Sequence, residues 1–142
     1  MLLTLAALLS LQSAEAVVVA RDAIQPHLAV DADGALYAVF LRNGNIEFSM
    51  SADKGATFGV PVTAIDAKGR ARGGMQRGPR VAVDSRKTIY VTAPLAFDDA
   101  EFQKRYPTQD LFLATSIDGG KTFSKPLMVD EVAMKAPESR HW

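Results

Sequence analysis

An eight-residue pattern occurs twice in this chain and constrains the fold more than any other feature. The first copy, SADKGATF, runs from Ser51 to Phe58, and the second, SIDGGKTF, runs from Ser116 to Phe123. Serine, aspartate, glycine, threonine and phenylalanine stand at the same offsets in both copies. Agreement of this kind indicates an internal repeat, which is typical of architectures built from stacked copies of one unit.

The repeat extends well beyond these eight residues. Residues 25–40 align with residues 78–93, with proline, aspartate and tyrosine matched at a separation of 53 positions (78 − 25). The two eight-residue patterns are 65 positions apart (116 − 51). The second unit therefore carries twelve extra residues (65 − 53), which fall between Ala93 and Asp110.

Within one unit, the local signals are those of strands and turns. The first unit contains short β-rich runs at residues 27–30, 35–41, 45–51 and 59–65. Asp33-Gly34 separates the first two runs and is a strong signal for a two-residue hairpin. Four antiparallel strands joined by tight turns, repeated at this period, predict the blades of a β-propeller.

The predicted fold class is therefore all-β, with antiparallel four-stranded blades of a propeller that is incomplete in this chain. Blade 1 is expected at about residues 24–66, blade 2 at about 78–130, and the start of blade 3 at about 139–142. Propellers close with about four to eight blades, so two blades and a fraction predict the N-terminal part of a longer protein. The alternative is a complete, compact two-sheet domain.

The first sixteen residues have the character of a secretory signal peptide. An apolar run from Leu2 to Leu11 is followed by a short polar stretch and the small residues Ala14 and Ala16, spaced as in a cleavage site. The run is too short to span a bilayer. We therefore expect residues 17–142 to be the mature chain, exported to the periplasm or the cell exterior, with no membrane span after cleavage.

Charge and metal-ligand patterns exclude several classes of partner. Sixteen basic and sixteen acidic residues cancel, so no overall field favours nucleic acid. There is no cysteine, and His27 and His141 lack neighbouring ligand patterns. Asp31 and Asp33 invite a calcium interpretation, but the required ligand and glycine spacing fails, and a hairpin turn explains them. We expect neither a cofactor nor a metal.

The twice-written pattern, Ser-x-Asp-x-Gly-x-Thr-Phe, resembles the Asp-box or BNR repeat of the sialidase (neuraminidase) superfamily. The resemblance implies a sialidase-like propeller of six blades. In that family the box lies at the turn between the third and fourth strands of a blade, away from the active site. The resemblance implies a structural role for the Asp-box residues, in which Asp closes the turn by accepting backbone hydrogen bonds. These residues are Ser51, Asp53, Gly55, Thr57, Phe58, Ser116, Asp118, Gly120, Thr122 and Phe123.

The resemblance also implies where substrate would bind. Sialidases hold the sugar carboxylate with three arginines, and the first lies two positions before a proline at the start of a blade. Arg77 occupies that place in the second unit, with Arg80 beside it, whereas the first unit has Ile24 there. Both arginines are candidate substrate-binding residues. The alternative is that residues 68–80 form a solvated basic loop.

The family's acid/base aspartate lies in the loop after the second strand of a blade. The inserted stretch supplies Asp98 and Asp99, which are the catalytic candidates, and Glu101. An insertion in one repeat is where repeat proteins commonly place a binding function. The family's second arginine is missing, because residues 93–95 read Ala-Pro-Leu; Arg42 holds the comparable place in the first unit.

Tyr106 is better explained as a packing residue of a proline-terminated loop than as a nucleophile. The family's tyrosine nucleophile and its glutamate would come from later blades, which this chain lacks. The resemblance implies a glycoside hydrolase of the exo-alpha-sialidase type, or a relative, acting on glycans or glycoconjugates. This two-blade part alone is expected to be inactive. The alternatives are a non-catalytic BNR-repeat propeller that binds glycan or protein, and a purely structural module.

Overall fold

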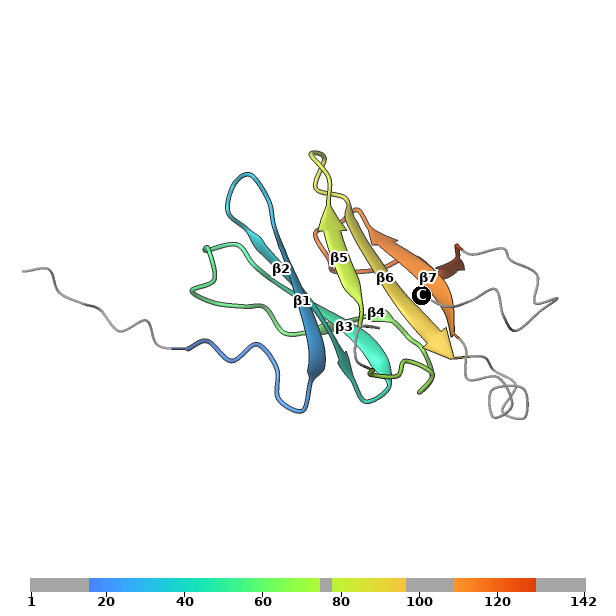
Figure 1. Cartoon of the computed structure of the whole chain (residues 1–142). Helices are drawn as coiled ribbons and strands as arrows, with labels where there is room; N and C mark the ends of the chain where they lie inside the picture. Colours follow the sequence, from blue (N-terminus) through green and yellow to red (C-terminus); the bar gives the residue numbers. More distant parts are fainter. Residues whose placement is uncertain (1–15, 75–77, 97–108, 130–142) are drawn as a thin grey trace, which may run out of the picture.

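The structure, a computed structural model, describes residues 16–74, 78–96 and 109–129. In this part, two four-stranded antiparallel sheets lie side by side (Figure 1). Sheet 1 is formed by β1 (Ile24–Val30), β2 (Leu36–Arg42), β3 (Asn45–Ser51) and β4 (Val62–Ile65), in that order. Sheet 2 is formed by β5 (Arg80–Val83), β6 (Ile89–Ala96), β7 (Gln109–Ser116) and β8 (Leu127–Met128). The prediction of an all-β chain with two four-stranded antiparallel sheets is confirmed.

Two parts of the predicted organisation lie outside the described residues. They are residues 1–15, which make up almost all of the expected signal peptide, and residues 130–142, which include the expected start of a third blade. The described ranges contain no helix with the length and apolarity needed to cross a membrane.

Two hairpins show how the sequence sets the turns. Asn43 and Gly44 both have positive φ, 51° and 73°, and join β2 to β3 in a two-residue turn of the kind that matches the twist of paired strands. The predicted two-residue turn at Asp33-Gly34 is wrong. Val30 pairs with Leu36, so the loop has five residues, 31–35, and only Gly34 within it has positive φ.

The reason for the longer loop is the side chain of Asp31. Its Oδ1 accepts the backbone N–H groups of Asp33, at 2.9 Å, and Ala35, at 3.0 Å. An Asp side chain that bonds the backbone two and four residues on replaces the tight turn with a wider one.

The hydrophobic core lies between the two sheets. Strand residues alternate between the two faces of a sheet, so every second residue of β2 and β3 faces the neighbouring sheet. The largest fully buried side chains of this core are Phe48, Ile46, Ile65, Ile89, Leu95, Val39 and Val91. Burying each such side chain contributes about 1.5–3 kcal/mol, so the contact between the sheets is a main source of stability.

The antiparallel order gives each sheet two distinct ends. At one, here named the arginine end, β1 and β5 begin and β2 and β6 stop. At the other, here named the box end, lie the β1–β2 and β5–β6 turns and both eight-residue patterns. Hydrogen bonds join the sheets at the arginine end, where the N–H of Ala71 donates to the carbonyl of Gly44 at 3.2 Å and the N–H of Ala96 donates to that of Arg70 at 3.0 Å.

Candidate functional site

The predicted substrate-binding and catalytic residues are only partly within the described chain. Arg80 is described, whereas Arg77, Asp98 and Asp99 lie outside the described residues, as do Glu101 and Tyr106. Arg80 is the first residue of β5, and it pairs with Thr92 in the middle of β6. It therefore lies at the arginine end, which is also the end where β6 stops and β7 begins around the inserted residues 97–108.

The side chain of Arg80 is exposed, and its hydrogen bonds in the described part of the chain all go to two neighbouring backbone carbonyl groups. Its Nη1 donates to the carbonyl oxygens of Pro79, at 3.0 Å, and Gly78, at 3.4 Å. Within the described ranges, no carboxylate forms an ion pair with it. A guanidinium with unused N–H donors can bind a carboxylate by two parallel hydrogen bonds.

His27 lies beside Arg80 and joins the two sheets. Its Nδ1 accepts the backbone N–H of Val81 at 3.2 Å, so the ring is unprotonated on that nitrogen. Burial, and then the positive charge of Arg80, lower the pKa of His27 below its ordinary value. The neutral imidazole therefore acts as a hydrogen-bond acceptor between β1 and β5.

Two other arginines at this end are engaged within the fold. Arg42 Nη2 lies 2.5 Å from Glu47 Oε2 across the β2–β3 hairpin, and its guanidinium lies 5.9 Å from the centre of the Phe40 ring. Arg70 donates to the carbonyl oxygen of Ala96 at 3.3 Å, and its guanidinium lies 5.8 Å from the centre of the Phe112 ring. These side chains stabilise the arginine end.

In its described part, the basic stretch 68–80 is exposed at Lys68, Arg72 and Arg80, as expected of a solvated loop, but it is fixed against the sheets at Arg70 and Ala71. Ala71 is only 5% exposed and forms a bridge with Leu95 of β6, and Arg70 is half-buried. The backbone hydrogen bond from Ala96 to Arg70 fixes this segment along the end of sheet 2. No local pattern predicts this contact, because a run of basic residues and glycines is usually exposed.

The first eight-residue pattern, at the box end, is a closed network of hydrogen bonds. Asp53 Oδ1 accepts from the hydroxyl of Ser51, at 2.7 Å, and from the N–H of Thr57, at 2.8 Å. Asp53 Oδ2 accepts from the hydroxyl of Thr57 at 2.6 Å, and the N–H of Gly55 donates to Ser51 Oγ at 2.7 Å. The bonds from Thr57 and Ser51 lower the pKa of Asp53 to about 2. A carboxylate satisfied in this way serves the turn, and it is poorly suited to acid/base chemistry.

The second pattern repeats the network. Asp118 accepts from both the N–H and the hydroxyl of Thr122, at 3.0 and 2.5 Å, and from the hydroxyl of Ser116 at 2.8 Å. These bonds hold the pKa of Asp118 well below its ordinary value. Phe123 of this pattern contacts Phe48 of sheet 1, with ring centres 5.3 Å apart in an edge-on arrangement. The second pattern therefore also joins the two sheets.

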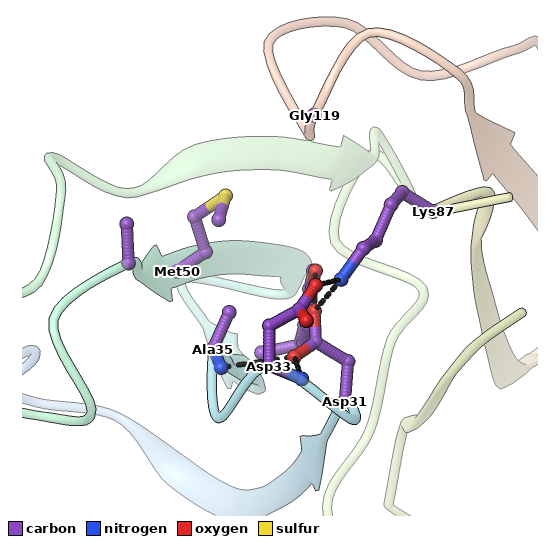
Figure 2. A pocket seen from close by; sticks show the side chains of 8 residues that line it. Asp31, Asp33, Ala35, Met50, Lys87 and Gly119 are labelled. Carbon is purple, nitrogen blue, oxygen red and sulfur yellow. Dashed lines mark hydrogen bonds and ion pairs between the residues drawn. The ribbon is translucent and has the colours of Figure 1, made fainter. Parts of the chain in front are cut away.

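A cleft of about 320 Å³ opens at the box end between the sheets (Figure 2). Lys87, on the β5–β6 turn, reaches across to sheet 1, where its Nζ lies 2.7 Å from Asp31 Oδ2 and 2.5 Å from Asp33 Oδ2. The hydroxyl of Tyr37 also donates to Asp31 Oδ2, at 2.7 Å. The lining residues are Asp31, Asp33, Ala35, Tyr37, Met50, Ala52, Lys87 and Gly119.

The electrostatics of this cleft favour a permanent ion pair. The hydrogen bonds from Lys87 and Tyr37 hold the pKa of Asp31 well below its ordinary value. In turn, the hydrogen bonds to the carboxylates of Asp31 and Asp33 raise the pKa of Lys87. Burial, followed by the hydrogen bond to Asp31, raises the pKa of Tyr37 to about 12. None of these three groups changes charge near neutral pH, so the cluster connects the sheets and is not set up for proton transfer.

Lys87 was not among the residues predicted from the sequence. Its contact with Asp31 joins residues 56 positions apart. The aligned position in the first unit is Gly34 (87 − 53), so the repeat itself gave no signal. The pairing of Asp31 with Tyr37 did have a signal in the repeat, because Asp84 and Tyr90 stand at the aligned positions. Tyr90 likewise donates to Asp84 Oδ2, at 3.1 Å.

No group of three or more histidine, aspartate or glutamate side chains that could hold a metal ion occurs within residues 16–74, 78–96 and 109–129. Asp31 and Asp33 do approach each other, but the ammonium of Lys87 lies between their carboxylates.

Comparison with solved structures shows a sialidase-like all-β fold. Fifteen chains match. One of them, described as Hadza microbial sialidase Hz136, is 26% identical, with a TM-score of 0.52 and 72% of this chain covered. This chain spans 25% of the length of that sialidase. No protein-family model matches the chain, and no curated protein matches it.

Proposed function

We propose that this chain supplies two blades of a sialidase-like β-propeller that acts on glycans ending in an acidic sugar. The likeness to a microbial sialidase over 72% of the chain carries this proposal. It is supported by the arginine end, where Arg80 offers unused guanidinium donors at the end of the sheet at which β6 stops and β7 begins. Arg77 and Arg80 would hold the sugar carboxylate, and Asp98 or Asp99 would serve as the acid/base group.

The chemistry of this pairing favours an anionic sugar. Guanidinium and carboxylate groups match in geometry and charge, so each arginine adds both affinity and orientation. The two Asp boxes would stabilise the turns at the opposite end of each blade. Their carboxylates already accept hydrogen bonds within those turns. Substrate binding and structural support would then occupy different ends of the same sheets.

The first experiment measures binding by NMR, with 3′-sialyllactose as ligand and neutral lactose as the control. We expect shifts of residues at the arginine end with the sialylated sugar only, and a loss of affinity of about tenfold or more in Arg80→Gln, since a charged hydrogen bond is removed. Arg86→Gln is the matched control, because Arg86 is an exposed arginine on the β5–β6 turn at the box end. Equal binding of both sugars, or equal effects of both variants, would overturn the proposal.

A non-catalytic propeller that binds glycan or protein is the second candidate function. Ala93, Pro94 and Leu95 occupy the place of the family's second arginine, which weakens the case for hydrolysis. Because the two-blade part alone is expected to be inactive, the two functions are separated by a fluorogenic sialoside assay of the whole propeller, with Asp98→Asn and Asp99→Asn as variants. Turnover that these variants abolish supports hydrolysis, whereas binding that survives both variants without turnover supports the binding module.

A further inference from the structure

Gln25 lies at the start of β1 in an unusual backbone conformation. Its φ is 52°, in the left-handed region that residues with a side chain rarely adopt. The pairing of β1 with β2 is irregular at the same place, because Ile24 pairs with Leu41 but His27 pairs with Val39, so β1 contains one extra residue. Such a β-bulge turns a side chain away from the direction that a regular strand gives it.

The side chain of Gln25 crosses from β1 to the stretch that leads into sheet 2. Its Nε2 donates to the carbonyl oxygen of Gly74, 49 positions away. Gly73 lies beside the same amide, because a Cβ at Gly73 would stand 3.3 Å from Gln25 Oε1 and 2.7 Å from Ile24 Cδ1. A side chain at position 73 would therefore push this backbone away from the amide that holds it.

Gln25 supports this stretch at a second point, next to Arg80. A Cβ at Gly78 would stand 3.0 Å from Gln25 Cβ and 3.5 Å from Arg80 Nη1. The carbonyl oxygen of Gly78 is one of the two that accept from Arg80 Nη1, and the other belongs to the fully buried Pro79. Gln25 therefore contacts the backbone that holds the guanidinium of Arg80.

The conformation of Gln25 costs stability in two ways. A left-handed backbone strains a residue that has a Cβ. In addition, Gln25 Oε1 is buried and accepts no hydrogen bond from any group in the described ranges, which is unfavourable for a polar atom. Glycine would avoid both costs, and the repeat has glycine at the aligned position, Gly78 (25 + 53). Costs of this kind concentrate where a function needs a particular geometry.

We propose that Gln25 is a positioning residue of the arginine end. It holds the backbone at Gly74 and Gly78, so that the guanidinium of Arg80 is presented in one orientation to the carboxylate of an acidic sugar. The identity of that ligand rests on the proposed function, whereas the positioning of Arg80 does not. A side chain that is already held in one orientation loses less conformational entropy on binding, so affinity rises.

The first test compares stability with affinity in Gln25→Gly. Glycine removes the backbone strain and the unpartnered acceptor together with the bond to Gly74, so the melting temperature of this chain should stay the same or rise by a few degrees. Affinity for 3′-sialyllactose should nevertheless fall by about two- to tenfold, the cost of ordering an arginine side chain that is no longer held. Lys54→Gly is the matched control, because Lys54 also has a positive φ, 61°, but lies at the box end. That control should leave the affinity unchanged.

The second test needs no sugar. Burial lowers the pKa of His27 most, and the positive charge of Arg80 lowers it further, so the titration of His27 in proton NMR reports where this guanidinium lies. In Gln25→Gly the pKa of His27 should rise toward 6.5, and in Lys54→Gly it should not change. The double variant Gln25→Gly/Arg80→Gln should have the same His27 pKa as Arg80→Gln alone, because both changes act through one charge.

Gln25→Asn separates the role of the side chain from the flexibility of glycine. Asparagine tolerates a left-handed backbone, but its side chain is one methylene shorter and does not reach Gly74. This variant should therefore lose affinity and raise the pKa of His27 as Gln25→Gly does. Affinity and titration that stay unchanged in Gln25→Asn would overturn the proposal, because the side chain would then have no part in positioning Arg80.

Three further outcomes would overturn the proposal. The first is an unchanged titration of His27 in Gln25→Gly. The second is a His27 pKa that rises further in the double variant than in Arg80→Gln, because Gln25 would then act on the burial of His27. The third is a melting temperature of Gln25→Gly several degrees below that of Lys54→Gly, which would mark a structural residue. If the unchanged chain binds no sialylated sugar, the proposed function fails, and the titration of His27 still decides whether Gln25 positions Arg80.

Discussion

Gly120 of sheet 2 lies against the ring of Phe48 of sheet 1 so closely that no other residue fits in its place. A Cβ on Gly120 would stand 2.1 Å from Phe48 Cε1, far inside van der Waals contact, and the φ of Gly120 is 82°. The same turn places Phe123 edge-on against Phe48. The second eight-residue pattern therefore does more than close its own turn, because it also sets how closely sheet 2 approaches sheet 1.

Replacing Gly120 with alanine is expected to destabilise the protein by about 2–4 kcal/mol, from overpacking against Phe48 together with the strain of a left-handed backbone. Gly119→Ala is the matched control, because Gly119 also has positive φ, 75°, but nothing lies within 4 Å of the added Cβ. We expect that control to lose about 1 kcal/mol, the backbone strain alone. Urea unfolding measures both values.

A double variant tests the cause of the Gly120 effect. In Phe48→Leu/Gly120→Ala the smaller side chain makes room for the methyl group, so the two losses should not add. Strict additivity, or equal losses in Gly119→Ala and Gly120→Ala, would contradict the proposed clash.

Acid should weaken the fold through the aspartates of the two eight-residue patterns. The pKa of Asp53 is about 2 in the folded protein, against an ordinary value of 3.8, so between these values the unfolded chain binds more protons than the folded one. The stability that Asp53 contributes is fully present above about pH 4 and is lost as the pH falls toward 2. Urea unfolding at a series of pH values should show this decline, and Asp53→Asn should make it shallower. An unchanged slope in Asp53→Asn would be inconsistent with this assignment.

The bridge from Lys87 to Asp31 should be visible in titration and in salt dependence. Lys87→Met removes the main cause of the lowered pKa of Asp31, so the pKa of that carboxyl should rise toward its ordinary value when followed by carbon NMR. The melting temperature should fall by a few degrees at low salt and by less at high salt, because ions screen exposed pairs. Arg86→Met is the control, as a neighbouring exposed cation that forms no ion pair with the described residues. Identical behaviour of the two variants would count against the bridge.

Stability should also fall as the pH is lowered through the range around 6.5, the ordinary pKa of His27. The pKa of His27 is lowered from 6.5, so in this range the unfolded chain takes up a proton that the folded chain does not. Protonation at Nδ1 would also break the hydrogen bond from Val81. His27→Gln should remove this part of the pH dependence, and Arg80→Gln should raise the pKa of His27 in proton NMR. A His27 pKa at or above 6.5 would contradict this account.

The strands were predictable because their signals are local. The run 45–51 was expected as a strand and is β3 with the same bounds. The alternation of apolar and polar residues and the Asn43-Gly44 pair act over a few residues. The same holds for each eight-residue pattern, whose hydrogen bonds span at most four positions. Such patterns can be read directly from the sequence.

The contacts that join the sheets were not predictable in the same way. Lys87 bonds to Asp31 at a sequence separation of 56 positions, and His27 bonds to Val81 at a separation of 54. Nothing in the local sequence of Lys87 distinguishes it from any other turn lysine. The turn at Asp31 also failed as a prediction, because the carboxylate of Asp31 competed with the tight hairpin that Asp33-Gly34 favours.

The separation of the two ends has a consequence for how such a chain can change over evolutionary time. At the box end, Gly120 against Phe48 and Lys87 against Asp31 leave little freedom for substitution. At the arginine end, β2 and β3 are joined by two residues, whereas twelve residues, 97–108, stand between β6 and β7. The same sheet design thus accepts connections of very different length at the arginine end, while the contacts at the box end hold the two sheets in a fixed relative position. A lineage can in this way acquire new specificities one loop at a time without refolding its scaffold.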